Sequence, residues 1–320
     1  MHIDPSIVAL RSDRALQRRL QIAMEAARDK WFGEAPTAAV IEDLEQYSAG
    51  AGLTGLPHLS ALVGSHDRAT HFVRRWCETM TEAVRLNPLG QVPFRYNCSA
   101  GYSAIRLATS GRASLSLLAY EERTDVAEPT SACFVAHDLH EIVLAGSAAG
   151  LVHNMECGIP RPISRRVEWS AGDRIVTCGT NETRQVISVS GRFSLLQLAR
   201  EEAGAPPTRE VALDSGRILH RSCGDKRDSQ TEMALAVLGA MRRQDAVPAM
   251  EAISAGGPPH LRWQAVRHTI ALNPQHGFAA LLRIAKTPDD ELFVPAGELR
   301  NQLASAYPQL LEQEFEPCPA

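Results

Sequence analysis

The feature that most constrains the fold is a change in hydrophobic period along the chain. From Val92 to about Leu219 the segments are short, rich in Val, Ile, Leu and Thr, and separated by Gly, Pro, Asn or Asp. On both sides of this stretch, apolar residues recur at the three- and four-residue spacing of one helix face. Short strands with frequent turn signals are typical of an antiparallel sandwich or barrel. The sequence therefore predicts an α+β protein, with a β-barrel flanked by N-terminal and C-terminal helices.

The predicted boundaries divide the 320 residues into three parts. We expect an N-terminal helical region at residues 1–90, a β-barrel at residues 91–225 and a C-terminal helical region at residues 226–320. Thr37 and Ser65 are predicted to cap two of the N-terminal helices, because their side-chain oxygens can accept from a backbone N–H of the first turn.

Turn signals give further expectations within these parts. The Gly-rich segment SAGAGLTGLPHL is predicted to be a connector between two N-terminal helices. Ser110-Gly111 and Ser190-Gly191 lie where hairpin turns are expected in the β region. In the C-terminal region, Ser229 and Glu232 form a capping-box pattern. That cap is followed by the apolar residues Met233, Val237, Leu238 and Met241.

The C-terminal helices are about a dozen residues long and are joined by short polar turns. This arrangement resembles HEAT repeats, with Pro288-Asp289-Asp290-Glu291 in the turn between two repeats. The resemblance covers about two repeats and implies a helical surface that binds a protein partner.

Composition narrows the possible partners and the location. The formal net charge of −4 and the pI near 6.3 give no overall attraction to nucleic acid or to an anionic membrane. No apolar run reaches the ~18 residues that a membrane span needs. The seven cysteines are scattered and include no CxxC pair, which argues against a disulfide framework. We therefore expect a cytoplasmic protein with neither a nucleic-acid nor a membrane partner.

The densest group of potential metal ligands lies in the β region. It comprises His137, Asp138, His140, Glu141 and His153. Side chains alternate between the two faces of a strand, so His137 and Glu141 share one face and Asp138 and His140 share the other. If His137 and Glu141 point into the barrel, an imidazole and a carboxylate meet near its axis.

The β region resembles the cupin superfamily over roughly residues 92 to 200. In the first cupin motif, G-x5-H-x-H-x3-E-x6-G, the second His falls on His137 and the Glu falls on Glu141, while the first His falls on Val135. In the second motif, G-x5-P-x-G-x2-H-x3-N, the His falls on Thr183, or on Glu182 when the motif is anchored at Gly179. The resemblance implies a jelly-roll barrel with a site at its centre.

The same resemblance implies a divalent metal ion, Fe²⁺, Mn²⁺ or Zn²⁺, held by His137 and Glu141. His153, expected on the next strand, and Glu182 are the candidates that would complete the ligand set. Two histidines and one carboxylate would suit Fe²⁺ and oxygen chemistry. This hypothesis makes the protein a metal-dependent oxygenase or hydroxylase that acts on a small molecule or a peptide.

A second hypothesis needs no metal. His137 and Glu141 can instead be a hydrogen-bonded pair in a degenerate cupin, which binds an organic ligand or a protein partner without catalysis. If Thr183, Gln185, Ile187 and Val189 form the inward side of their strand, Glu182 points outward. Several arginines could pair an acidic ligand or could be solvated charges at strand edges. They are Arg165, Arg166, Arg184 and Arg192.

Overall fold

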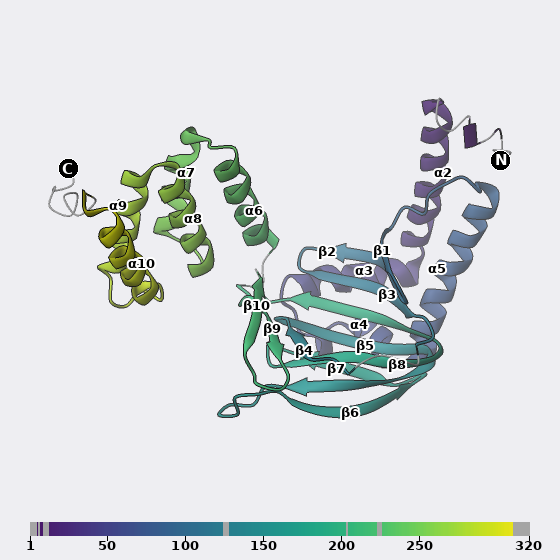
Figure 1. Ribbon diagram of the computed structural model, residues 1–320. Coiled ribbons are helices and arrows are strands. Elements are labelled where there is room, and N and C mark those ends of the chain that lie inside the picture. The colour runs from purple at the N-terminus through teal and green to yellow at the C-terminus, as the bar shows by residue number, and fades with distance from the viewer. Residues whose placement is uncertain are drawn as a thin grey trace. The chain divides into compact units, whose positions relative to one another are not determined.

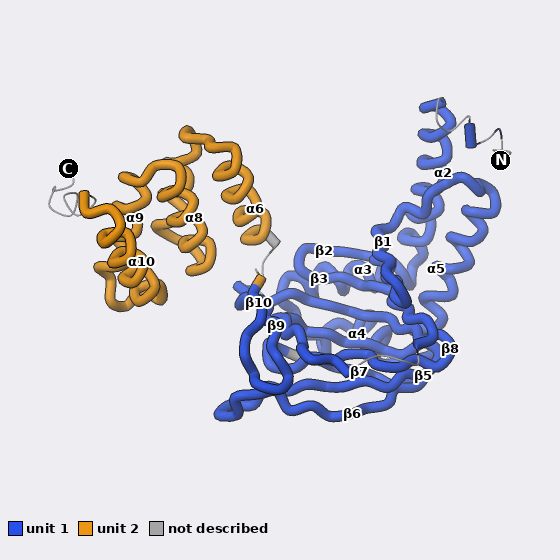
Figure 2. Tube along the Cα trace, viewed as in Figure 1, with its two compact units in different colours: residues 1–221 blue, residues 222–320 orange. Residues whose placement is uncertain are grey.

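The computed structural model describes residues 13–123, 128–202, 204–222 and 226–309, together with residues 5, 7 and 8. The chain forms two compact units, residues 1–221 and residues 222–320 (Figure 2). The first contains helices and two antiparallel sheets, and the second is helical. The predicted mixed α+β class, with helices at both ends, is confirmed. The predicted N-terminal and central regions lie together in the first unit.

The N-terminal helices begin close to where capping residues predict them. Ser65 caps its helix as predicted, and its Oγ accepts from the backbone N–H of Arg68. The prediction for Thr37 is wrong, because the helix starts at Ala35 with Pro36 in its first turn, where a missing N–H has no cost. The Gly-rich connector contains an unpredicted short helix. The elements are α2 (Arg14–Phe32), α3 (Ala35–Ser48), η1 (Leu53–Gly55), α4 (Pro57–Gly64) and α5 (His66–Leu86).

The strands form two antiparallel sheets. The larger has seven strands in the order β1-β2-β3-β8-β5-β6, with β7 also paired to β5, and the smaller has the order β10-β9-β4. In the described residues β1 pairs only with β2 and β6 only with β5, so the predicted closed jelly-roll barrel is not formed. The strands are β1 (Arg95–Ser99), β2 (Tyr102–Ser110), β3 (Ala113–Tyr120), β4 (Ser131–Phe134), β5 (His137–Asn154), β6 (Ile163–Ser170), β7 (Arg174–Cys178), β8 (Glu182–Glu201), β9 (Thr208–Ala212) and β10 (Ile218–Ser222).

Two strands, β5 and β8, are far longer than expected and organise the larger sheet. They pair along their whole length, from His137 opposite Glu201 to Asn154 opposite Glu182. The predicted hairpin at Ser110-Gly111 joins β2 to β3, but the one at Ser190-Gly191 is wrong because that dipeptide lies inside β8. The ladder shifts register on both sides of Ala145, and Gly146 there has φ +83°, with the Arg192 carbonyl only 2.0 Å from where a Cβ would lie. A side chain at residue 146 would therefore clash with the partner strand.

The larger sheet has two differently covered faces. The helical face packs against α3, α4 and α5 through residues such as Ile142, Leu196 and Leu198, and Figure 1 shows α3 and α4 behind the sheet. The inner face carries Val143 and Leu195, which pack in a second core with Phe193 and Trp169. Successive residues of β5 and β8 thus alternate between the two cores, as strand geometry requires.

The second unit is a set of short helices whose main core includes Val266, Phe278 and Leu281. The predicted cap at Ser229 is wrong, because helix α6 begins at Lys226 and Ser229 lies inside it. Leu235 of this helix is buried, whereas Met233, Val237 and Met241 are exposed. Within the described ranges, no helix combines the length and apolar character that crossing a membrane requires. The helices are α6 (Lys226–Ala240), η2 (Gln244–Ala246), α7 (Val247–Ala255), α8 (Pro259–Leu272), α9 (Pro274–Ala285) and α10 (Phe293–Ala306).

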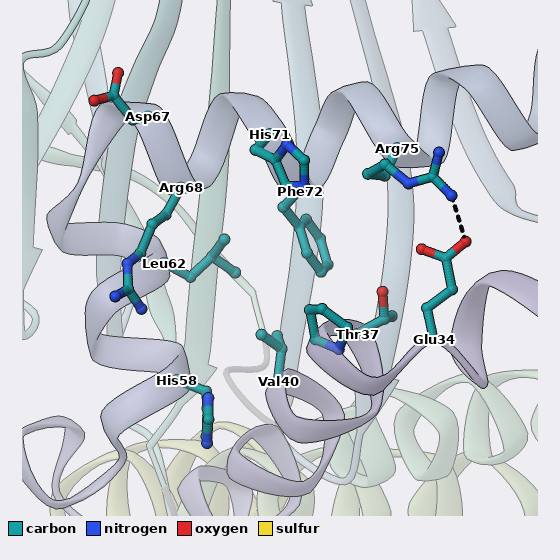
Figure 3. A pocket seen from close by; sticks show the side chains of 11 residues that line it. Glu34, Thr37, Val40, His58, Leu62, Asp67, Arg68, His71, Phe72 and Arg75 are labelled. Carbon is teal, nitrogen blue, oxygen red and sulfur yellow. Dashed lines mark hydrogen bonds and ion pairs between the residues drawn. The ribbon is translucent and has the colours of Figure 1, made fainter.

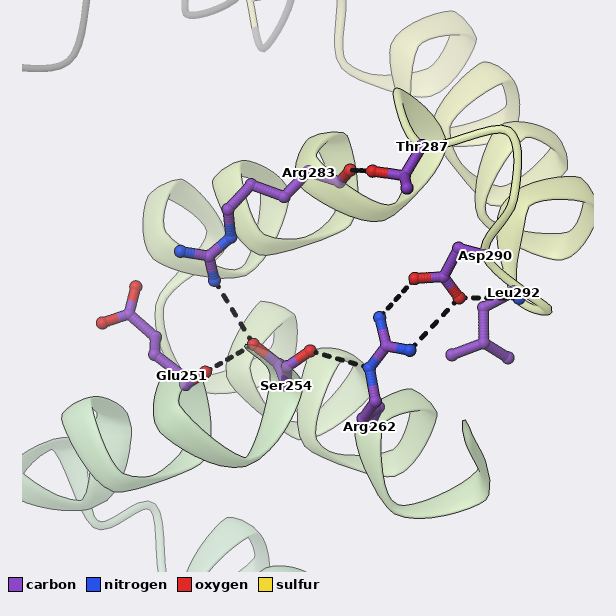
Figure 4. A network of polar contacts seen from close by, with 7 residues as sticks. All are labelled: Glu251, Ser254, Arg262, Arg283, Thr287, Asp290 and Leu292. Carbon is purple, nitrogen blue, oxygen red and sulfur yellow. Dashed lines mark hydrogen bonds and ion pairs between the residues drawn. The ribbon is translucent and has the colours of Figure 1, made fainter. Parts of the chain in front are cut away.

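A polar network joins these helices (Figure 4). Arg262 of α8 donates to both carboxylate oxygens of Asp290 in the turn before α10, and its Nε donates to the carbonyl of Ser254 in α7. Arg283 of α9 donates from Nη2 to the side-chain oxygen of Ser254. Hydrogen bonds from Arg262 and the backbone of Leu292 hold the pKa of Asp290 below its ordinary value. The network fixes three successive helices to one another, and the HEAT-like interpretation of them stays a prediction.

Candidate functional site

A buried carboxylate lies at the centre of the inner face. Glu141 of β5 is 1% exposed and shares the inner face with Val143, as the alternation predicts. Arg184 of β8 donates to it from both Nε and Nη2, one to each oxygen. Gln197, the direct partner of Glu141 across the ladder, donates from Nε2 to Oε1 over 2.7 Å. We call these three residues the Glu141 cluster, and it satisfies a charge that would be costly to bury alone.

Two aromatic residues, Trp169 and Tyr120, lie beside the guanidinium of Arg184. Its side chain is only 9% exposed, and its Cζ lies 5.7 Å from the centre of the Trp169 ring. Burial acts to lower the pKa of Arg184, but Glu141 and a hydrogen bond with Tyr120 outweigh it and hold the pKa above its ordinary value. Burial raises the pKa of Tyr120, and the positive charge of Arg184 opposes that rise only in part. At neutral pH the guanidinium of Arg184 is therefore charged, and the phenol of Tyr120 beside it is neutral.

A pocket of about 320 Å³ opens beside this guanidinium. Its polar lining includes Tyr120, Arg184 and Arg123, and none of the residues that line it in the described structure carries a carboxylate. The backbone of Arg123 is fixed by two hydrogen bonds to Val189, while its side chain is exposed. The lining of the pocket thus combines two arginines with a tyrosine.

His137 is half-buried on the same face of β5 as Glu141. Burial lowers the pKa of His137, while the charges of Glu141 and Asp138 act in the opposite direction without cancelling it. Its imidazole is therefore neutral at pH 7. Asp138 and His140 point to the helical face, where Asp138 pairs with Arg200. The predicted division of this strand into two faces is correct.

His153 lies on β5 itself rather than on the next strand, because β5 continues through its bend. It is fully buried, with Nδ1 2.8 Å from Ser164 Oγ and Nε2 2.9 Å from Gln185 Oε1. The amide of Gln185 is oriented by its Nε2, which donates to the carbonyl of Ser131. Its Oε1 must therefore accept from Nε2–H of His153, which leaves Nδ1 to accept from the Ser164 hydroxyl. Both ring nitrogens are used, and burial lowers the pKa of His153.

Glu182 lies at the far end of the β5–β8 ladder, where its Oε2 accepts from the Asn154 amide over 3.3 Å. The expected inward set of β8 is split by a register shift between Ala149 and Gly150. On one side of that shift Val189 lies in the inner core, as expected. On the other side Arg184 reaches the inner face, whereas Gln185 bonds His153 on the opposite face. Periodicity alone could not reveal this exchange.

The residues present do not fit a metal ion. Glu141 accepts three hydrogen bonds and faces the positive charge of Arg184, and both nitrogens of His153 are engaged. His137, Glu141, His153 and Glu182 do not converge, and across the described ranges no three His, Cys, Asp or Glu residues are placed to hold a metal. A metal site formed by these four residues therefore stays a prediction, and the geometry of the described residues does not bring them together. The sequence identified Arg184 only as one of several arginines that could pair an acidic ligand or be solvated, and it gave no sign of the pairing with Glu141.

Comparisons with known proteins give weak similarities to cupin structures. No family model matches the sequence, and no curated protein matches it. A cupin superfamily protein from Desulfitobacterium hafniense is 16% identical over 32% of this chain and 81% of its own, with a TM-score of 0.23. The cupin domain of Drosophila melanogaster CENP-C is 13% identical, over 36% of this chain and 89% of its own, with a TM-score of 0.25. KdgF from Halomonas sp. is 15% identical, over 35% and 89%, with a TM-score of 0.24. Scores this low support no conclusion about the activity of this chain.

Proposed function

We propose that the β region is a non-catalytic, cupin-like module that binds a small organic anion. The observation that carries the proposal is the ion pair between Arg184 and Glu141. The guanidinium of Arg184 supplies the positive charge that a metal ion would supply in a metal-dependent cupin. A carboxylate that is already neutralised by a fixed guanidinium has little affinity for a second cation.

Hydrogen-bond capacity indicates the chemistry of the ligand. A guanidinium has five N–H donors, of which Arg184 gives two to Glu141. Tyr120 engages the same group, and both residues line the pocket. Arg123 adds a second positive charge on the rim. Charge-assisted hydrogen bonds to a ligand carboxylate would suit this lining, and the pocket volume is at the small end of the range for ligand sites.

The helical unit supplies a second element of the proposal. Its successive helices, joined by the network around Arg262, would present a HEAT-like surface to a protein partner. Ligand binding in the first unit and partner binding in the second would make the chain a sensing or interaction protein. The competing hypothesis, a metal-dependent oxygenase or hydroxylase, requires a metal that His137 and Glu141 retain.

Calorimetric titration of the full-length protein with succinate, compared with its neutral analogue succinamide, tests the ligand class. We expect succinate to bind and succinamide to bind far more weakly. Arg123→Gln removes one charged donor from the rim and should weaken succinate binding about tenfold or more, the value of one hydrogen bond to a charged group. Arg192→Gln is the matched control. Like Arg123, Arg192 is an exposed arginine, but it lies on β8 and does not line the pocket.

Elemental analysis of the same preparation, grown with added iron, manganese and zinc, tests the competing hypothesis. We expect no metal in stoichiometric amount. Stoichiometric metal that disappears in His137→Ala would contradict the proposal and support the oxygenase. Equal binding of succinate and succinamide, or equal losses in Arg123→Gln and Arg192→Gln, would contradict the ligand class.

A further inference from the structure

The N-terminal helices enclose a hollow that the central site does not use. Three helices each present one face to it, and its volume is about 400 Å³. Helix α5 contributes Arg68, Phe72 and Arg75, which are spaced as neighbours along one helix face. At a rise of 1.5 Å per residue, Arg68 and Arg75 are about 10 Å apart along the axis. The hollow shares no lining residue with the pocket beside Arg184.

The floor of the hollow is apolar and its two ends are polar (Figure 3). Val40 of α3, Leu62 of α4 and Phe72 of α5 are all buried and lie between the ends. This floor is fixed from below, since the buried carboxylate of Asp43 accepts from the backbone N–H groups of His58 and Leu59 at the start of α4. The shape is therefore built into the helical packing rather than left by a surface loop.

The two ends differ in charge. At one end Arg75 is neutralised by Glu34 at 2.9 Å and by Glu78 at 2.8 Å. At the other end Arg68 has no side-chain hydrogen bond or ion pair to any residue that the structure describes. Asp67 also lines the hollow, and its Oδ1 lies 3.8 Å from Nδ1 of His66 rather than against Arg68. His58 lies on the same side as Arg68. One end thus holds one guanidinium between two carboxylates, and the other holds a guanidinium that no carboxylate of the described residues pairs.

We propose that this hollow binds an amphipathic carboxylate. The apolar body of the ligand lies along Val40, Leu62 and Phe72, and its carboxylate accepts hydrogen bonds from the guanidinium of Arg68. An apolar lining with a few placed polar groups is the usual composition of a small-molecule site. The distance between the polar ends limits the ligand to a body of about 10 Å. This site is independent of the proposed function of the central pocket.

Titration of the full-length protein with octanoate tests the proposal, and octanamide serves as the neutral analogue of the same length. We expect octanoate to bind, with Arg68→Gln weakening it about tenfold or more and Arg68→Glu abolishing measurable binding. Arg74→Gln is the matched control, since Arg74 is an exposed arginine of the same helix that does not line the hollow. Octanamide should bind weakly and should not respond to Arg68→Gln. Because Arg68 is exposed, its variants should unfold at the same temperature as the wild type.

Three results would overturn the proposal. The first is the absence of octanoate binding to the wild-type protein. The second is octanoate binding that survives Arg68→Glu, or that falls equally in Arg74→Gln. The third is loss of octanoate binding in Arg123→Gln with no effect of Arg68→Gln, which would place octanoate in the central pocket instead. Succinate binding should respond only to Arg123→Gln, so failure of one proposal leaves the other intact.

Discussion

Two arginine–carboxylate pairs join β5 to β8 from opposite faces of the same sheet. On the inner face Arg184 pairs with Glu141, and both side chains are almost fully buried, at 9% and 0% exposed. On the helical face Arg200 pairs with Asp138 at 2.7 Å, with 21% and 25% exposed. The two pairs use the same charges on the same two strands, so any difference in their roles comes from the groups around them.

On the helical face, the arginine of the pair makes further contacts within the chain. Arg200 Nη1 donates to the carbonyls of Tyr47 and Ala51 at the end of α3, and its Cζ lies 4.1 Å from the centre of the Tyr47 ring. It satisfies carbonyls that the end of a helix leaves free and ties α3 to the sheet. Arg184 instead lines a pocket. The comparison indicates a structural connector on one face and a binding group on the other.

The largest effect that distinguishes the two pairs is expected for Arg184→Ala. Removing the guanidinium leaves the carboxylate of Glu141 buried with only Gln197 as a partner. Breaking a buried pair in this way costs about 3–5 kcal/mol of unfolding free energy. Urea denaturation followed by circular dichroism measures the loss.

The double variant Glu141→Gln with Arg184→Met is the control for that experiment. It removes both charges together, and paired replacement of a buried ion pair is often close to neutral. We expect it to recover most of the stability that Arg184→Ala loses. A double variant as unstable as the single one would show that the cluster contributes through packing rather than through charge.

The comparison also shows what the sequence can predict. Alternation along β5 places Glu141 and Asp138 on opposite faces, and both placements are confirmed because the strand is regular there. Arg184 could not be placed in the same way. It is 43 residues from Glu141, and a register shift between them reverses the expected faces of β8. A pairing that depends on a bulge has no local sequence signal.

The helices show the same limit. Ser65 identified the start of α5 because its cap is local to the sequence. Helix α4 was missed because the glycines that precede it predict a loop. Its apolar residues Leu59 and Leu62 are buried through contacts with other parts of the folded chain. In α6 apolar residues recur at helical spacing, but Leu235 is buried in the core and Met233 is exposed. Which apolar face is buried is decided by neighbouring helices and not by the period.

A smaller effect is expected for Arg200→Ala on the helical face. The variant removes the ion pair with Asp138 and two hydrogen bonds to carbonyls at the end of α3, but Asp138 remains partly exposed and can be hydrated. We expect a loss of roughly 1–3 kcal/mol, the range for hydrogen bonds to a charged group. Hydrogen exchange of α3 amides should also increase. A loss as large as that of Arg184→Ala would remove the proposed distinction between the two faces.

The smallest expected effect is a pH dependence contributed by the histidines of β5, which lie on both faces. Burial lowers the pKa of His137, His140 and His153, so each binds its proton more weakly in the folded chain than in the unfolded one. The stability associated with the neutral histidines is fully present above their unfolded pKa of about 6.5. It is lost as the pH falls below that value and through their pKa in the folded chain. Between pH 7 and pH 6 each histidine then costs at most about 0.7 kcal/mol of unfolding free energy.

His153 is suited to measuring this effect of burial on its own, because both of its ring nitrogens have neutral partners, Ser164 and Gln185. His153→Gln keeps hydrogen-bonding groups at the position but cannot bind a proton there. Urea midpoints measured at pH 7 and pH 6 should therefore differ less in this variant than in the wild type, even if the variant is less stable at both. A wild-type protein that becomes more stable as the pH falls from 7 to 6 would show that the net linkage has the opposite sign. The carboxylates beside His137 and His140 would then outweigh their burial, and the inner and helical faces of β5 would have to be compared by charge rather than by exposure.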